Sequence, residues 1–161
     1  MDDFVQRLLK NINSSNYFPI KRSFGHTLEN CNVDAIIAYS KISQNKTTNQ
    51  HDRNVEFLVS GLCYMTQKPN KSIENKNVVN FETLLKRLNR PGEVENFLKL
   101  RYDANGYFHK RFYIIAKKAI TCIYPNEIIN YSQLIDDLKY WNNTIKIRWA
   151  MTIVNIENEG E

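Results

Sequence analysis

Cysteine and histidine are scarce in this chain, and the few that occur are widely separated. Its 161 residues include three cysteines and three histidines, at Cys31, Cys63, Cys122, His26, His51 and His109. Zinc sites usually draw paired ligands from positions a few residues apart, and no such spacing occurs here. Because each cysteine lies in an apolar stretch, we expect reduced, buried thiols in a cytoplasmic protein. The sequence therefore predicts no metal site and no cofactor.

Long apolar runs are also missing. No stretch approaches the roughly 18 apolar residues that indicate a membrane-spanning helix. The chain begins with Met1-Asp2-Asp3, which is acidic and lacks the apolar segment of a signal peptide. We therefore expect a cytoplasmic protein that does not interact with a membrane.

Catalytic patterns are absent from the sequence as well. It contains no phosphate-binding glycine loop and no local motif that would pair a nucleophile with a base, such as Cys63 with His109. Beyond the N-terminus, Asp136 and Asp137 are the only adjacent carboxylates. Adjacent helical positions point about 100° apart, so these two could not hold one metal ion together. We expect both to lie on a solvated helix face, and we expect the protein not to be an enzyme.

Helical periodicity is the dominant pattern that is present. Apolar residues recur at helical spacing over residues 4–9, 33–42, 55–62, 81–88, 94–98, 108–119, 134–141 and 147–154. We see no alternating strand and no internal repeat. The sequence predicts an all-α fold, a bundle of about eight helices in two small lobes.

The two predicted lobes meet near a polar segment rich in lysine and asparagine. The N-terminal lobe covers residues 1–79 with this linker near 68–79, the C-terminal bundle covers 80–156, and 157–161 form an acidic tail. We expect close helix packing at Gly61, which lies inside the third helix. In the last helix, Ile147, Ala150, Met151 and Val154 are expected to face inward. Trp141 and Trp149 are expected to be largely buried.

Positive charge is concentrated in the middle of the chain. The net charge is +5, and residues 81–125 hold 9 basic against 4 acidic side chains, whereas residues 126–161 hold 3 against 6. Such an asymmetry suggests an acidic partner for the middle of the chain. No acidic residue occurs between Asp103 and Glu127.

The predicted helix over residues 108–119 carries the clearest basic pattern. Positions seven apart return to nearly the same direction on a helix, so Lys110 lies above Lys117 and Arg111 above Lys118. The apolar positions 108, 112, 115 and 119 face away from this ridge, which is about 10 Å long. A solvated helix face would show the same pattern and remains an alternative. A charged track for an acidic polymer such as nucleic acid is the other interpretation.

Further basic clusters strengthen the second interpretation. None has an acidic residue four positions on that would neutralise it. They are Lys21 with Arg22, Lys86 with Arg87 and Arg90, and Lys146 with Arg148. Together with the ridge they predict a basic track on a small helical domain.

An ordered set of segments resembles one known family. The segments are residues 20–22, the helix 51–66, the helix 81–88 with its Pro91-Gly92 turn, and residues 97–103, 109–111, 130–141 and 146–150. Together they resemble the CasB family, the small subunit of the type I-E CRISPR surveillance complex Cascade. The resemblance covers nearly the whole chain.

The resemblance implies a function in antiviral defence without catalysis. It implies two copies of the chain arranged head to tail, bound to the large subunit and the repeated backbone subunit. It also implies contacts with guide RNA and target DNA, and stabilisation of the displaced strand of the R-loop. The residues that it places on the nucleic-acid track are Lys21, Arg22, Arg101, Lys110, Arg111, Lys117, Lys118, Lys146 and Arg148. Local charge alone adds Lys86, Arg87 and Arg90.

Two other classes of protein fit a small basic helical chain. A regulator of helix-turn-helix type would need a recognition helix after a short turn. The turn at Pro91-Gly92 leads instead into Glu93-Val94-Glu95, which is acidic where phosphates would lie. An adaptor without nucleic-acid contact would show no salt-dependent binding.

Overall fold

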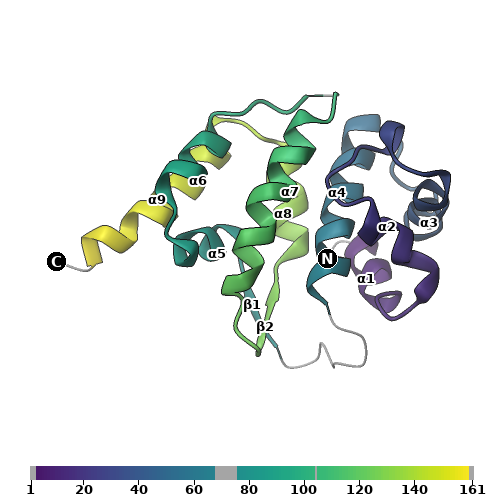
Figure 1. Ribbon diagram of the computed structural model, residues 1–161, viewed down its shortest axis with the longest axis horizontal. Coiled ribbons are helices and arrows are strands. Elements are labelled where there is room, and N and C mark those ends of the chain that lie inside the picture. Colours follow the sequence, from purple (N-terminus) through teal and green to yellow (C-terminus); the bar gives the residue numbers. More distant parts are fainter. Residues whose placement is uncertain (1–2, 68–75, 104, 160–161) are drawn as a thin grey trace.

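The computed structural model describes residues 3–67, 76–103 and 105–159, and these parts of the chain are mostly helical (Figure 1). They form nine α-helices and one small sheet, with 70% of residues in helices, so the all-α prediction is confirmed. The helices are α1 (Asp3–Lys10), α2 (Phe18–Arg22), α3 (Val33–Ser43), α4 (Gln50–Thr66), α5 (Phe81–Leu88), α6 (Pro91–Leu98), α7 (Tyr107–Ala119), α8 (Tyr131–Lys139) and α9 (Asn143–Glu159). The strands are β1 (Asn77–Val79) and β2 (Glu127–Ile129).

Polar residues and proline set several helix boundaries. The side chain of Asn49 accepts a hydrogen bond from the Asp52 amide at the start of α4. At the start of α8, the side chain of Asn130 accepts one from the Gln133 amide. Asn89 ends α5 in the left-handed conformation, and Pro91 occupies the first turn of α6. The break between α5 and α6 therefore follows from the local sequence.

The strands β1 and β2 pair in parallel, which the sequence did not predict. Asn77, Val78 and Val79 pair with Glu127, Ile128 and Ile129. The Asn130 amide extends the pairing by donating to the Val79 carbonyl at 2.8 Å. The end of the predicted linker is therefore a strand, and its residues 68–75 lie outside the described residues.

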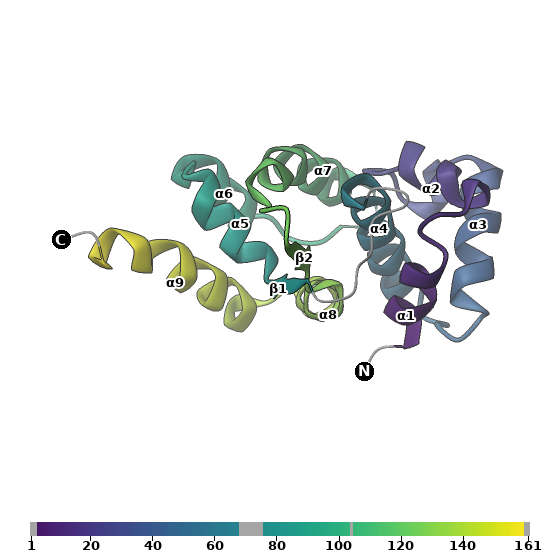
Figure 2. The ribbon, with the colours of Figure 1, turned by 90° about the horizontal axis from the view of Figure 1, so that it is seen from below.

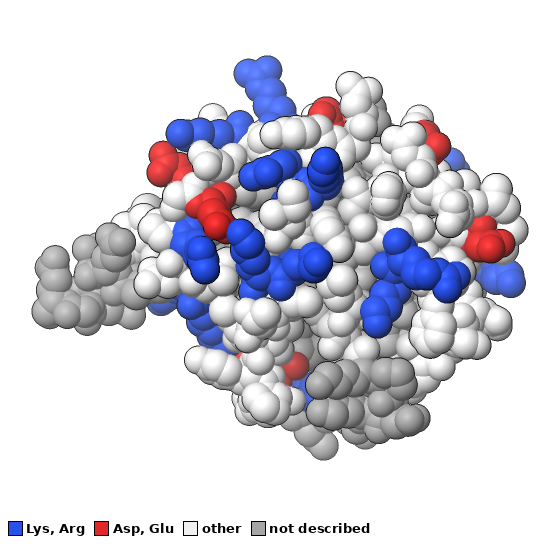
Figure 3. Space-filling model, viewed as in Figure 1, with Lys and Arg blue, Asp and Glu red and all other residues white. Residues whose placement is uncertain are grey.

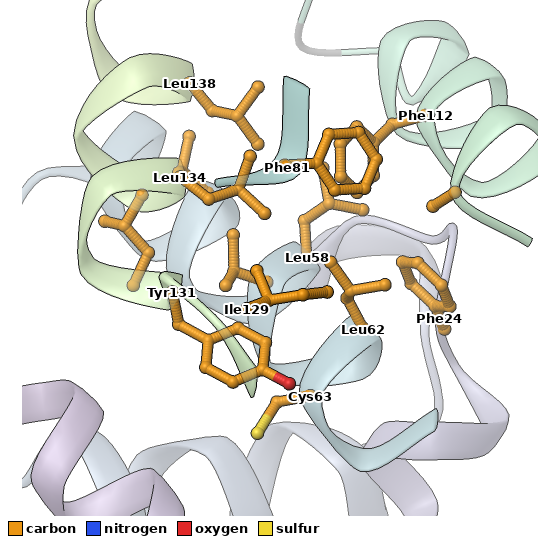
Figure 4. Close-up of a cluster of buried hydrophobic side chains, with 14 of the residues drawn as sticks. Phe24, Leu58, Leu62, Cys63, Phe81, Phe112, Ile129, Tyr131, Leu134 and Leu138 are labelled. Atoms are coloured by element: carbon orange, nitrogen blue, oxygen red, sulfur yellow. The ribbon is translucent and has the colours of Figure 1, made fainter. Parts of the chain in front are cut away.

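The two halves of the chain pack against each other. Helix α4 of the N-terminal half contacts both α2 and α8, and α5 contacts α7 and α9. In Figure 4, Leu58 and Leu62 of α4 lie close to Ile129 of β2 and Phe81 of α5. The buried apolar side chains form one connected core that extends into both halves.

Helix α2 is the helix that periodicity missed, because five residues are too few to show a period. It contacts α4, and Phe24, two residues beyond the end of α2, packs onto Gly61, where an added Cβ would lie 2.8 Å from Cδ1 of Phe24. Gly61 is thus closely packed as expected, but the contact comes from Phe24 in the turn after α2 and not from a second helix.

Helices α3 and α9 each carry two apolar stripes, and the stripe of α9 that was predicted to face inward is mostly exposed. Ile147, Met151 and Val154 are 61%, 55% and 49% exposed, so their predicted inward orientation is wrong. Trp149 is fully buried, and Ile145 and Ile153 pack against the core. The C-terminal part of α9 extends away from the other helices, which leaves little for its outer stripe to pack against (Figure 2).

The same ambiguity affects α3. Val33, Ile36 and Ile37, which mark this helix in the sequence, are exposed, whereas Ala35, Ala38, Tyr39 and Ile42 are buried. Both sets of residues follow the helical period, so spacing alone could not decide between them.

Candidate nucleic-acid interface

Helix α7 presents its basic residues outward as the sequence predicts. Phe108, Phe112, Ile115 and Ala119 are buried against the core, which confirms the predicted inner face. Among the ridge residues, Lys110 and Lys117 are exposed, and Arg111 and Lys118 are half-exposed. The helix starts after Gly106, whose φ of 92° permits the chain to turn from the preceding loop.

Two hollows lie along the outward side of α7. The first, of about 470 Å³, lies between α7 and the segment that follows α2. The second, of about 510 Å³, lies between α7 and the turn that joins α5 to α6. Tyr113 and Ile114 line both hollows, so the two are neighbours along the helix.

Five cations from three parts of the chain line these hollows, and we call them the cationic face. Arg22 and Lys110 line the first hollow, and Arg90, Lys117 and Lys118 line the second. Among the described residues, no carboxylate lines either hollow. Figure 3 shows lysine and arginine side chains spread across the surface over α7 and α2, with fewer acidic ones. Lys21 is exposed on the same short helix as Arg22.

Tyr113 forms a fixed wall between the two hollows. Its ring packs edge-on against Phe24 with centroids 5.1 Å apart, and Nζ of Lys117 lies 5.1 Å from its centroid. Gly25 has a φ of +97°, and a Cβ there would lie 2.9 Å from Cβ of Tyr113. Glycine at position 25 therefore allows the segment after α2 to approach α7 closely enough to form the first hollow.

Glu93 of α6 partly neutralises the second hollow. Its two carboxylate oxygens each accept a hydrogen bond from Nζ of Lys118 at 2.9 Å, and Arg90 lies 3.8 Å away. The hydrogen bond from Lys118 holds the pKa of Glu93 below its ordinary value. A phosphate that reached this hollow would compete with Glu93 for the same two cations.

Arg87 belongs to the structure of the bundle instead. Its guanidinium donates to both carboxylate oxygens of Glu127 at 2.6 and 2.9 Å, and to the Cys122 carbonyl at 3.1 Å. It also lies 3.9 Å from the centroid of the Tyr124 ring. The contact with Arg87 lowers the pKa of Glu127. Its neighbour Lys86 is half-exposed on α5.

Arg148 is likewise engaged by carboxylates, although they are distant in sequence. It forms ion pairs with Glu82 of α5 and Asp137 of α8, and both carboxylate side chains are almost completely buried. Asp137 also accepts hydrogen bonds from Nε1 of Trp149 and Nε2 of Gln133, each at 2.9 Å. Only Asp136 of the adjacent carboxylates is exposed, so the expected solvation of Asp137 is wrong.

The remaining predicted residues, Arg101 and Lys146, lie together in a separate hollow. The structure thus places nine of the twelve predicted basic residues in three groups: five on the cationic face, two in a second cationic hollow and two as structural arginines. Lys21, Lys86 and Arg111 line none of these hollows. In the sequence, none of the basic clusters has an acidic residue four positions further on, which suggested that they were unpaired. Most of their carboxylate partners come from other elements of the fold, so this local test missed the ion pairs.

His109 lies beneath the ridge and is fully buried. Its Nδ1–H donates to the His26 carbonyl at 3.1 Å, and its Nε2 accepts from the Tyr102 hydroxyl at 2.6 Å. Burial lowers the pKa of His109 to about 4. The imidazole is therefore neutral near pH 7 and joins α7 to the segments on either side of it.

We expect this histidine to make folding sensitive to mild acid. The unfolded chain binds a proton near the ordinary histidine pKa of 6.5, whereas the folded chain does so near 4. The contribution of His109 to the free energy of unfolding is therefore fully present above pH 6.5 and is lost as the pH falls toward 4, by about 3 kcal/mol in total. Urea unfolding at pH 7 and pH 4.5 measures this loss. A His109→Gln variant should show a flatter pH dependence, and an unchanged slope would contradict the assignment.

In the described parts of the chain, no three His, Cys, Asp or Glu side chains lie close enough to hold a metal ion. None of the described helices has the length and apolar content needed to cross a bilayer. No protein-family model, curated protein or solved structure matches the chain.

Proposed function

We propose that this protein binds nucleic acid without catalysis and with little sequence preference, through the cationic face. The observation that carries the proposal is the grouping of Arg22, Arg90, Lys110, Lys117 and Lys118 around two adjoining hollows. Residues from three separate segments converge there, which a solvated face of a single helix does not require. Lysine and arginine that contact phosphates supply affinity without reading base sequence.

The resemblance to the CasB family supports a more specific form of this proposal. In that form the chain is a small subunit of a Cascade-type CRISPR complex, and its cations stabilise the guide-bound target DNA and the displaced strand. Co-purification tests it: a tagged chain expressed from its native locus should recover guide RNA together with larger subunits. Recovery of the chain alone would leave only the general nucleic-acid-binding proposal.

A helix-turn-helix regulator finds less support in the structure. Helix α6 follows the short turn after α5 and would be the recognition helix. Its outward side chains include Glu93 and Glu95, of which Glu95 is 68% exposed. Carboxylates at these positions would repel DNA phosphates, so we do not propose sequence-specific recognition.

The salt dependence of binding tests the cationic face directly. Each phosphate contact contributes about −0.7 to the slope of log K against log salt on single strands. Replacing Lys110 and Lys117 together with glutamine should make the slope less steep by about 1.4. The melting temperature should stay unchanged, because both side chains are exposed. An unchanged slope, or strong preference for one sequence at fixed salt, would argue against the proposal.

Glu93 offers a variant that should act in the opposite direction. Glu93→Gln releases Lys118 and Arg90 from their carboxylate partner, so binding should become tighter and the salt slope steeper. Glu95→Gln is the matched control, since it removes the same charge from the same helix. Glu95 pairs with the exposed Lys99 at 3.3 Å, outside both hollows. Equal gains from the two variants would show that net charge matters and the cationic face does not.

A further inference from the structure

A third hollow, of about 540 Å³, lies away from the cationic face and has a chemistry of its own. It forms where the loop after α6 meets the start of α4 and the turn between α8 and α9. These three segments lie near the upper edge of Figure 1. Its lining residues are His51, Arg101, Tyr102, Lys139, Trp141, Asn142, Asn143 and Lys146. No described carboxylate is among them.

Two cations in this hollow are available to a ligand. Lys146 donates to the Leu100 carbonyl at 3.0 Å, and an ammonium group has three N–H donors, so two more can be used. Arg101 is exposed and lies close enough to Lys146 for their charges to interact. Burial and the charge of Arg101 together lower the pKa of Lys146. An anion placed between these side chains would relieve their mutual repulsion.

The other polar groups on the wall are largely engaged. Lys139 lies 3.8 Å from the buried Glu56, and Nε2 of His51 donates to the Lys139 carbonyl at 3.0 Å. These contacts hold the back of the hollow in place. The positive charge offered to a ligand therefore comes mainly from Arg101 and Lys146.

The start of α9 adds further donors and a favourable dipole. This 17-residue helix begins at Asn143, on the wall of the hollow. The Asn142 side chain accepts from the Ile145 amide at 3.1 Å, which leaves the first amides of the helix for other partners. Anions are stabilised near a helix N-terminus.

Two aromatic rings make the wall rigid. Trp141 packs against Phe97 and Trp149 with centroids 5.3 and 5.0 Å apart, and its Nε1 donates to the Leu100 carbonyl at 3.0 Å. Tyr102 is held by its hydrogen bond to His109. Arg101 lies between Leu100, whose carbonyl accepts the Trp141 bond, and Tyr102.

We infer that this hollow binds a phosphomonoester, either the terminal phosphate of a nucleic-acid strand or that of a free nucleotide. A monoester carries a charge of about −1.5 to −2 at pH 7 and offers three unsubstituted oxygens. These match the donors of Arg101, Lys146 and the start of α9. An internal diester offers less charge and fewer free oxygens to the same donors. The inference does not depend on the cationic face binding a strand.

Binding of oligonucleotides that differ only at one end tests the inference. The full chain is titrated with the same single strand carrying either a 5′-phosphate or a 5′-hydroxyl. The phosphorylated strand should bind about 10-fold more tightly, which corresponds to about 1.4 kcal/mol. Inorganic phosphate should abolish this advantage when sodium chloride of equal ionic strength does not.

Variants separate this hollow from the cationic face. Arg101→Gln and Lys146→Gln should remove the advantage of the 5′-phosphate and leave binding of the hydroxyl strand nearly unchanged. The Leu100 carbonyl still accepts from Nε1 of Trp141 in Lys146→Gln, which favours a folded variant. Lys99→Gln, on an exposed side chain two residues before Arg101, is the control and should change neither.

Thermal melting distinguishes the two sources of the ligand. If inorganic phosphate or a nucleoside monophosphate raises the melting temperature of the chain but not of Lys146→Gln, while strand ends give no advantage, the ligand is a free phosphate. Equal affinity for the 5′-phosphate and the 5′-hydroxyl strand, together with no stabilisation of the chain by phosphate, would overturn the inference. If Arg101→Gln or Lys146→Gln also lost binding of the 5′-hydroxyl strand, this hollow and not the cationic face would hold the strand, which would count against the proposed function.

Discussion

Replacing Arg148 with alanine is expected to lower the free energy of unfolding by about 2–4 kcal/mol. The loss arises from the two carboxylates that remain, because Glu82 and Asp137 are buried and would lose their cationic partner. Breaking a fully buried ion pair costs about 3–5 kcal/mol, and we take a lower range because Arg148 itself is 41% exposed. Urea unfolding followed by circular dichroism measures the change.

Two controls make the result specific to this cluster. Lys99→Ala removes an exposed cation paired with Glu95, and should change stability by less than about 0.5 kcal/mol. Adding Glu82→Gln to Arg148→Ala removes one of the stranded charges, so the double variant should recover part of the lost stability. If Arg148→Ala melts like the parent chain, water replaces the guanidinium without cost and Arg148 returns to the candidate nucleic-acid contacts.

Truncation of Trp149 to alanine should be the most damaging single change, at about 3–5 kcal/mol. The side chain is fully buried and lies against three aromatic rings, those of Phe81, Phe97 and Trp141. Its Nε1 also donates to Asp137, so the variant leaves both a cavity and a weakened buried carboxylate site. Domains of this kind have a total free energy of unfolding of about 5–15 kcal/mol, so a loss of this size would leave a large part of the variant unfolded at physiological temperature if the parent chain lies at the low end of that range.

The matched comparison is Trp141→Ala. Trp141 is only partly buried, and its Nε1 donates to a backbone carbonyl in a loop. We therefore expect a smaller loss than for Trp149→Ala, with Trp149→Phe between the parent chain and Trp149→Ala. A larger loss for Trp141 than for Trp149 would show that the packing order of the two rings is reversed.

Helix content could be predicted from the sequence because it depends on local pattern. The inner face of α7 follows from four apolar positions that share one direction, and no second apolar stripe competes with it. Helices α3 and α9 have two apolar stripes, and which one is buried depends on how far the neighbouring helices extend. Strands β1 and β2 have three residues each and pair across a separation of about 50 positions, so neither leaves a periodic signal.

The candidate site was predictable to a similar extent. The positions of Lys110 and Lys117 on an exposed ridge follow from helical geometry. The carboxylate partners of Lys118, Arg87 and Arg148 lie 11 to 66 positions away, so local charge could not reveal which cations were already neutralised. Gly25, Tyr113 and Glu93 shape the cationic face. The sequence did not assign Gly25 or Tyr113 to it, and Glu93 was considered only as an acidic position after the Pro91-Gly92 turn. The roles of Gly25 beside Tyr113 and of Glu93 at the edge of the second hollow depend on how α2, α6 and α7 pack, which the sequence does not show.

The parallel pair of β1 and β2 also sets an order of events during folding. The hydrogen bond from the Asn130 amide to the Val79 carbonyl closes a loop that contains α5, α6 and α7. Closing a loop of this length carries an entropic cost before any strand contact is gained, whereas the helices inside it form from neighbouring residues. We therefore expect the three helices to associate first and the strands to pair afterwards. Pairing of the two strands would then be a late step in folding, which brings the start of α5 and the start of α8 together after the helices between them have assembled.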